Sequence, residues 1–256
     1  MGFASAIRAR SPPFLIMNQP ITTETTVAEI VRAVPGRSRL LDQLGLDYCC
    51  GGKKSLADAC RRKGLDAATV VALLNALDAT PTDRDGDGIN PDKLTLAELC
   101  DHIERVHHEY LRQELPRLDF MTRKVAAVHG EHEPRLLEIR DTFADFAVAM
   151  ALHTEEEEKL VFPAIRRLGS AAAVSDTSAA PLKTTLEKLE SDHDRAGSAL
   201  ERLHALTDNF SPPEWACNTF RALYDGLREL DWETHQHVHK ENNVLFPRAL
   251  ATCGAM

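Results

Sequence analysis

The sequence contains little that predicts a β-strand, and no apolar run reaches the roughly 18 residues that a membrane-spanning helix needs. Leu, Ala, Glu and Arg are abundant instead, so we expect an all-α protein without a membrane segment. Lys and Arg number 30 against 39 Asp and Glu, and no basic cluster offsets the formal net charge of -9. These features argue against nucleic acid and anionic membranes as partners.

Cysteines are sparse for a secreted, disulfide-rich protein, with six in 256 residues. We interpret them as reduced thiols and expect a soluble, cytoplasmic protein. Residues 1–16 end in no small-residue cleavage site, so the support for a signal peptide is weak. They are expected to be a disordered tail or, if Met17 is the true start, an over-extended reading frame.

Two stretches of the chain repeat one spacing of histidine and glutamate. They are His153-Thr-Glu-Glu-Glu157 and His237-Val-His-Lys-Glu241, and each is followed by Phe-Pro, at 162–163 and at 246–247. Residues four apart lie on one face of an α-helix. Each pair can therefore reach one metal ion, or two metal ions with the carboxylate between them.

Both pairs occupy positions that should be apolar on a bundle helix. The stripes step alternately by three and four, through Ile139, Phe143, Phe146, Met150, His153, Glu157, Leu160 and Ala164, and through Leu223, Leu227, Leu230, Thr234, His237, Glu241 and Val244. A buried carboxylate without a partner costs several kcal/mol. A metal ion would compensate that cost most directly.

Two further helices are expected to contribute histidines. His193 interrupts a third stripe, which is formed by Leu186, Leu189, Ala196, Leu200 and Leu203. On a fourth helix, His107 continues the stripe of Leu96, Cys100 and Ile103, whereas His108 begins that of Leu111, Leu115 and Leu118. Periodicity leaves the choice between these two histidines open. Four helices with inward-pointing His and Glu are typical of metal pairs in bundle cores.

The first 80 residues predict a small helical module. Thr26 and Glu29 form a capping box, Ser38 is expected to cap a short helix that ends at Gly45, and two more helices are expected at about 55–63 and 66–78. The turn between Gly45 and the helix expected at about 55–63 reads Asp47-Tyr-Cys-Cys-Gly-Gly52. Adjacent Cα atoms are about 3.8 Å apart, too close for an unstrained disulfide. Cys49 and Cys50 are either small buried residues or thiols presented for metal or redox chemistry.

An acidic linker separates this module from the bundle. Asp83, Asp85 and Asp87 copy the start of an EF-hand loop, but Leu94 stands where a bidentate Glu is needed, so a solvated linker is favoured over a Ca²⁺ site.

The bundle helices are expected from Thr95 to about 118 or beyond, and at about 134–168, 182–208 and 214–240, with a loop at 169–181. His129 and His132 fall near a turn, where exposure is favoured over ligation.

Residues in both parts resemble one known family. From about residue 94 the chain resembles a hemerythrin-like domain, and the DYCCGG module resembles the small domain that precedes it in repair-of-iron-centres proteins. The motifs DYCCGG (47–52), ESDHDRAG (190–197) and ENNVLFPRAL (241–250) support the likeness. It implies a helical Cys-Cys domain (27–80) and a hemerythrin-like four-helix up-down bundle (94–251). The sequence itself adds a tail (1–26) and the acidic linker (81–93), which departs from the family pattern.

The resemblance also implies the metal ligands. His108 matches the family motif because it stands six residues after His102 and eight before Pro116. The implied set holds two non-haem irons with an oxo or hydroxo bridge, and it consists of His108, His153, Glu157, His193, His237 and Glu241. Glu157 and Glu241 are expected to bridge the irons. Asp192 replaces the Glu that the family commonly has before the third-helix histidine, so no proton-transfer role is carried over to it.

The family resemblance implies a repair function. We expect a protein that repairs iron–sulfur clusters damaged by nitric oxide or oxidative stress by supplying iron, with Cys49 and Cys50 assisting the transfer. Two alternatives stay open: an enzyme that reduces NO to N₂O, and a sensor of O₂ or NO. The implied partners are damaged iron–sulfur proteins and small diatomic ligands, and the protein is expected to be a monomer or a homodimer.

Overall fold

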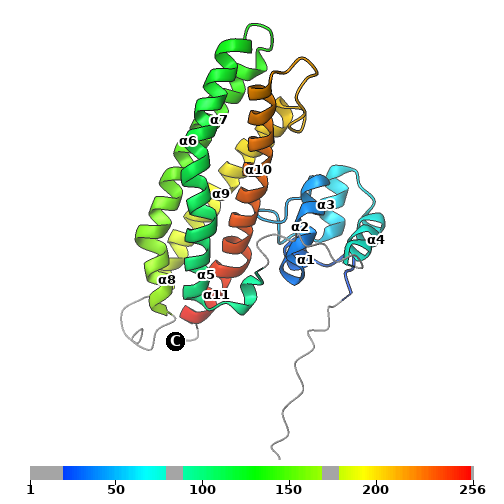
Figure 1. The fold of residues 1–256 in the computed structure, drawn as a ribbon. Helices are drawn as coiled ribbons and strands as arrows, with labels where there is room; N and C mark the ends of the chain where they lie inside the picture. Colours follow the sequence, from blue (N-terminus) through cyan, green and yellow to red (C-terminus); the bar gives the residue numbers. More distant parts are fainter. Residues whose placement is uncertain (1–19, 79–88, 169–178, 255–256) are drawn as a thin grey trace, which may run out of the picture.

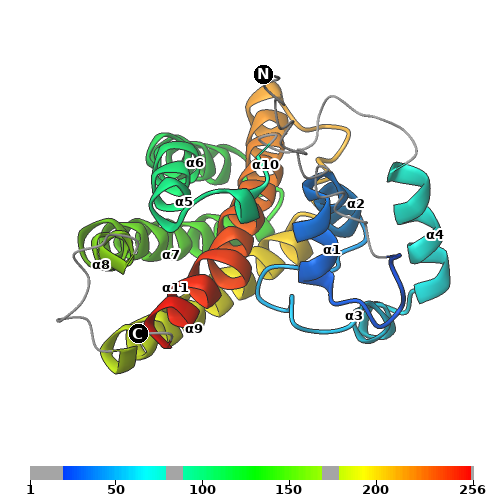
Figure 2. The ribbon, with the colours of Figure 1, turned by 90° about the horizontal axis from the view of Figure 1, so that it is seen from below.

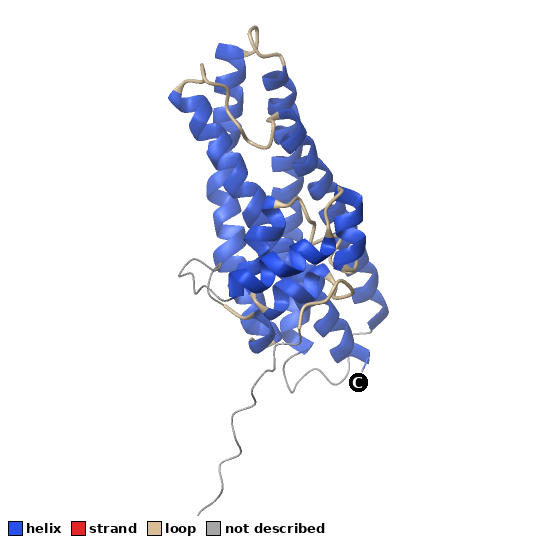
Figure 3. Ribbon diagram, turned by 90° about the vertical axis from the view of Figure 1, so that its right-hand side faces the viewer, coloured by secondary structure: helices blue, strands red, loops and turns tan. Residues whose placement is uncertain are grey.

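The computed structural model describes residues 20–78, 89–168 and 179–254. Within these ranges the regular elements are helices, which confirms the all-α prediction (Figure 3). Backbone pairing of the β type is limited there to an isolated bridge between Thr26 and Ser55. The predicted tail as far as residue 19, the EF-hand-like aspartates and most of the loop predicted at 169–181 lie outside the described residues. Residues 20–26, also predicted as tail, instead pack against the small module: Ile21 is buried, and the carbonyls of Thr23 and Thr25 accept hydrogen bonds from the amides of Ala57 and Leu56.

Four long helical segments, built from the helices between Leu96 and Gly254, run up and down beside one another and form the bundle (Figure 1). Three of them are interrupted by a short π-helical turn, which separates two α-helices. The segments are, in order, α5 (Leu96–Ile103), η3 (Glu104–His108) and α6 (Glu109–His129); α7 (Arg135–Glu156), η4 (Glu157–Val161) and α8 (Phe162–Leu168); α9 (Ala179–Leu206); and α10 (Asn218–Lys240), η5 (Glu241–Leu245) and α11 (Phe246–Gly254).

The π-helical turns correct two predictions. A π turn contains one more residue than an α turn, so it advances the register of everything that follows. Leu160, predicted in the core, is 64% exposed, and Val161 takes its place at 2% exposure. The last segment also does not end at Phe246-Pro247 but continues to Gly254. Pro247 is tolerated because it follows η5 closely, where the α-helical hydrogen-bond ladder is already interrupted.

Shorter helices form a module beside α10 (Figures 1 and 2). They are α1 (Val27–Ala33), a 3₁₀ turn (Pro35–Arg37), α2 (Ser38–Gln43), α3 (Leu56–Lys63) and α4 (Ala67–Asp78), and a further 3₁₀ turn (Pro91–Lys93) leads into the bundle. The capping boxes of Thr26 with Glu29 and of Thr95 with Glu98 are confirmed. Ser38 is not a cap, because the 3₁₀ turn runs directly into α2 and gives Ser38 helical dihedral angles.

The bundle has two apolar clusters, one on each side of a layer of buried polar side chains. The larger cluster includes Leu115, Phe143, Leu200 and Leu227, and the other includes Phe162, Leu186 and Phe246. The small module has its own cluster, centred on Leu41, Leu56 and Leu74. In the described part of the chain, no helix is both long enough and apolar enough to cross a bilayer.

Candidate metal centre

The polar layer of the bundle contains the predicted metal ligands. The structure brings together all six from the four bundle segments, and none is more than 4% exposed: His108, His153, Glu157, His193, His237 and Glu241. Three of them lie at π-helical turns, which are frequent at functional sites. His108 closes η3, Glu157 opens η4 and Glu241 opens η5.

The turn η3 explains why helical periodicity could not decide between His107 and His108 as the metal ligand. Its extra residue joins two stripes that are out of register by one position, so both His107 and His108 are buried. Only His108 is grouped with the central carboxylates. His107 instead contacts Glu233 at 3.2 Å and Lys240 at 3.0 Å.

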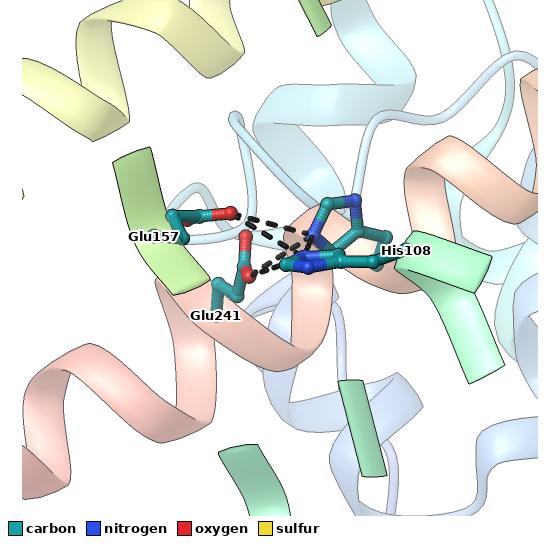
Figure 4. A group of neighbouring side chains, drawn as sticks. His108, Glu157 and Glu241 are labelled. Atoms are coloured by element: carbon teal, nitrogen blue, oxygen red, sulfur yellow. Dashed lines mark hydrogen bonds and ion pairs between the residues drawn. The ribbon is translucent and has the colours of Figure 1, made fainter. Parts of the chain in front are cut away.

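Four potential ligand atoms converge in a first group. Nε2 of His108 and Nε2 of His237 are 3.1 Å apart. Oε2 of Glu157 lies 3.4 Å from Nε2 of His108, and Oε1 of Glu241 lies 3.0 Å from Nε2 of His237. Figure 4 shows both carboxylates directed at the His108 imidazole.

A second group repeats this arrangement with the other oxygen of each carboxylate. Nε2 of His153 and Nε2 of His193 are 2.8 Å apart. Oε1 of Glu157 lies 3.3 Å from His153, and Oε2 of Glu241 lies 3.2 Å from His193. Each carboxylate therefore offers one oxygen to each group. This sharing is the arrangement by which carboxylates bridge metal pairs in helical bundles.

The two buried carboxylates would be stabilised by a bound cation. Neither oxygen of Glu157 accepts a hydrogen bond from a described residue, and the same is true of Oε2 of Glu241. Both side chains are 0% exposed. An isolated carboxylate buried in this way costs several kcal/mol. Imidazole nitrogen and carboxylate oxygen, without thiolate, suit iron or manganese, so the residues present fit a metal pair.

The charges of the side chains balance within the centre. Burial raises the pKa of the Glu241 carboxyl, but His237 and His193 outweigh this and hold it well below its usual range. Burial lowers the pKa of His153, but Glu157 and Glu241 reverse the effect and raise it to about 9. The His153 imidazole therefore attracts a proton that a bound metal ion would displace.

Two side chains that the sequence did not single out orient the histidines. Oδ1 of Asn242 lies 2.8 Å from Nδ1 of His193. Oε1 of Glu158 lies 2.8 Å from Nδ1 of His108 and accepts a hydrogen bond of 2.7 Å from Arg112. In each case the contact leaves Nε2 facing the centre.

The role of Glu158 corrects a prediction. The acidic run Glu155–Glu158 suggested a solvated face apart from Glu157, yet the Glu158 side chain is only 29% exposed. The reason is again the π turn η4, which widens the helix directly after Glu157 and brings the next residue toward η3. Only recognition of that turn in the sequence would have identified Glu158.

Three other residues singled out in the sequence lie outside the two groups. Oδ2 of Asp192 is 3.9 Å from Nδ1 of His153, too long for a hydrogen bond. His129 is at the end of α6, where its Nε2 lies 3.3 Å from Sγ of Cys217. His132 is exposed in the following turn, where its ring contacts Trp215.

The DYCCGG turn is fixed against the bundle. The side-chain amide of Asn243 donates to the carbonyls of Tyr48 and Cys49 at 3.2 and 3.0 Å, and Gln236 donates to the Tyr48 hydroxyl at 2.7 Å. A Cβ at Gly52 would lie 2.5 Å from the Tyr48 carbonyl oxygen, so only glycine fits there. Cys49 is buried and Cys50 is half-buried, and neither is in a disulfide.

Two family descriptions match this chain. Residues 100–249, more than half of the 256 residues, match the hemerythrin HHE cation binding domain. Residues 23–78 match ScdA_N, a domain of unknown function (DUF542). The buried groups of His and Glu lie within the first of these matches.

Proteins named iron-sulfur cluster repair protein are similar to almost the whole chain. ScdA of Staphylococcus haemolyticus is 35% identical over 226 residues, which cover 88% of this chain and 98% of the relative. YtfE of Escherichia coli is 35% identical over 225 residues, which cover 88% of this chain and 96% of the relative. As its motifs indicated, the chain therefore belongs to the repair-of-iron-centres family, the family of the iron-sulfur cluster repair proteins ScdA and YtfE.

Proposed function

We propose that this protein holds two non-haem irons in its bundle and supplies iron to iron–sulfur clusters damaged by nitric oxide or oxidative stress. The observation that carries the proposal is the pair of four-atom groups that share Glu157 and Glu241. Relatives named for cluster repair support the same function.

Each residue of the centre has a distinct part in this proposal. The proposed ligands of one iron are His108 and His237, and those of the other are His153 and His193. Glu157 and Glu241 would bridge the pair together with an oxo or hydroxo group. Iron held in this way would be a redox-active pair and, when released, the cargo for a damaged cluster. Asn242 and Glu158 keep two of the imidazoles in the ligating orientation.

A second candidate function follows from the number of ligand atoms. Each group offers two imidazole nitrogens and two carboxylate oxygens, which is fewer than the six ligands of octahedral iron. The remaining positions suit a small diatomic molecule. With an electron donor, reduction of two NO molecules to N₂O and water would make the protein an enzyme, whereas reversible binding of NO or O₂ alone would make it a sensor.

The deciding experiment begins with metal content. The full chain, purified without oxygen, is expected to contain two irons and to show near-ultraviolet oxo-bridge absorption that reduction removes. Added to an iron–sulfur enzyme that NO has inactivated, it should restore activity while its own iron content falls. Zinc or no metal in repeated preparations would contradict the proposal. N₂O production without loss of iron would favour the enzyme instead.

A further inference from the structure

We propose that Asp47, Cys49 and Cys50 form a second, exchangeable metal site, which binds a thiophilic divalent transition metal such as Fe²⁺. The site lies in the DYCCGG turn, outside the polar layer of the bundle. The proposal that iron binds here transiently before it reaches a damaged cluster rests on the proposed function. The ability of the site to bind a metal is independent of that function.

The distance between the two thiols fits a shared metal ion. Sγ of Cys49 and Sγ of Cys50 are 3.6 Å apart. Two metal–sulfur bonds of about 2.3 Å at a tetrahedral angle would separate the sulfurs by about 3.8 Å. Oδ1 of Asp47 is 3.2 Å from Sγ of Cys49, and one ligand atom from each of the three residues lies within 4.8 Å of the others.

The backbone of the turn already holds these groups in place. The amides of Cys49 and Cys50 each donate to Oδ1 of Asp47 at 3.0 Å, and the amide of Gly51 donates to Oδ2 at 2.7 Å. A Cβ at Gly51 would lie 2.8 Å from Oδ2 of Asp47, so glycine permits this wrapping. Because the turn is ordered by its own hydrogen bonds, binding a metal requires little rearrangement.

The ligand set predicts exchange rather than permanent retention. Structural sites usually have four protein ligands, whereas three leave a position for an incoming group. A cysteine binds a metal ion as the thiolate, so protons compete with the metal for the two sulfurs and binding increases with pH.

The turn lies against the helices that contribute the bundle ligands. A Cβ at Gly197 would be 3.8 Å from Sγ of Cys50, and Gly197 is one helical turn beyond His193 on α9. Asn243, which holds the turn, directly follows Asn242, which contacts His193. Asp47 also lines a cavity of about 870 Å³ between the module and the bundle.

Cobalt titration of the full chain tests the site. Co²⁺ added without oxygen to chelator-washed protein is expected to give one thiolate-to-cobalt charge-transfer signal per chain, and Asp47→Asn should weaken this binding at least tenfold. The double variant Cys49→Ser/Cys50→Ser should abolish the signal while its circular dichroism spectrum stays unchanged. Cys217→Ser is the matched control, because Cys217 is an exposed thiol beside His129.

The outcomes separate this inference from the proposed function. Absence of the thiolate signal, its persistence in the double serine variant or its loss in Cys217→Ser would each overturn the site, whatever metal the bundle holds. A thiolate signal in a chain whose bundle binds no iron would support the site while the proposed function fails. The double variant should also keep the bundle iron and its spectrum but lose cluster repair. Unchanged repair would show that the Asp47–Cys49–Cys50 site takes no part in iron transfer.

Discussion

Glu157 shows how burial and chemistry are linked at the level of a single residue. Its position in an apolar stripe was visible in the sequence, and the structure leaves both of its oxygens without a hydrogen bond from a described residue. The two oxygens face different pairs of histidines. A side chain that is so costly to bury is best explained by the cations that it would bridge.

Replacing either central carboxylate should remove the metal and leave the fold intact. In Glu157→Ala or Glu241→Ala, both groups lose an oxygen, so affinity should fall by more than the ~10–100-fold typical of residues that only orient ligands. Metal analysis and circular dichroism would measure the two effects. Glu155→Ala, at an exposed position on the same helix, should retain all its metal. A Glu157→Ala variant that kept two irons would show that Glu157 is not a bridge.

Glu158 should matter through His108 rather than directly. Glu158→Leu removes the acceptor from Nδ1 of His108, so we expect metal affinity to fall ~10–100-fold. Glu158→Gln keeps an acceptor oxygen and should fall much less. Competition with a chelator would measure both affinities. Equal losses in the two variants would mean that the charge of Glu158, and not its contact with His108, supports the centre.

At the level of elements, the π-helical turns combine core packing with ligation. A plain α-helix would put Leu160 in the core after Glu157, whereas η4 exposes it and buries Val161. The same device lets His107 and His108 both lie inside the bundle. Each turn thus gives a ligand-bearing helix one extra residue at the level of the polar layer.

Deleting Leu160 tests the role of η4. The deletion should convert the π turn into an α turn and still leave Val161 and Ile165 on the core side, because the later stripe moves back by one position. We expect preserved helical content and a substantial loss of metal affinity, measured by circular dichroism and metal titration. Full metal binding with an unchanged spectrum would mean that the widened turn is dispensable.

At the scale of the whole molecule, the small module contacts the bundle through charged as well as uncharged polar groups. Nδ1 of His235 on α10 lies 3.2 Å from Oδ1 of Asp42 on α2. Burial lowers the pKa of His235, but Asp42 and Asp231 outweigh it and raise the value to about 9. The contact therefore depends on a proton that is bound more tightly in the folded protein than in the unfolded chain.

This contact should make stability fall in mildly alkaline solution. The folded pKa of His235 exceeds the unfolded value of about 6.5, so its contribution is complete below that pH and is lost as pH rises through about 9. Denaturant unfolding between pH 6 and 10 would measure this, and His235→Gln should show a flatter profile than the natural chain. His132→Gln, at an exposed turn, should match the natural chain. Parallel profiles for His235→Gln and the natural chain would contradict the assignment.

Much of the fold and the centre was predictable because helices have a fixed period. The stripes through His153, His193 and His237 followed from steps of three and four, and both capping boxes followed from local spacing. The choice of His108 over His107 needed the family motif, since the stripes differ by one position there. The roles of Glu158 and Asn242 were not predicted, because they depend on contacts between helices far apart in the sequence.

The sequence by itself determined the all-α class, the positions of the main bundle helices and the polar residues that interrupt their apolar stripes. These are local properties, since periodicity and capping act over a few turns of one helix. Only the tertiary structure decided which oxygen of each carboxylate faces which pair of histidines, where the π turns shift the register, and how the Cys49–Cys50 turn docks against Asn243. Those features depend on the packing of four segments at once, and no single segment contains that information.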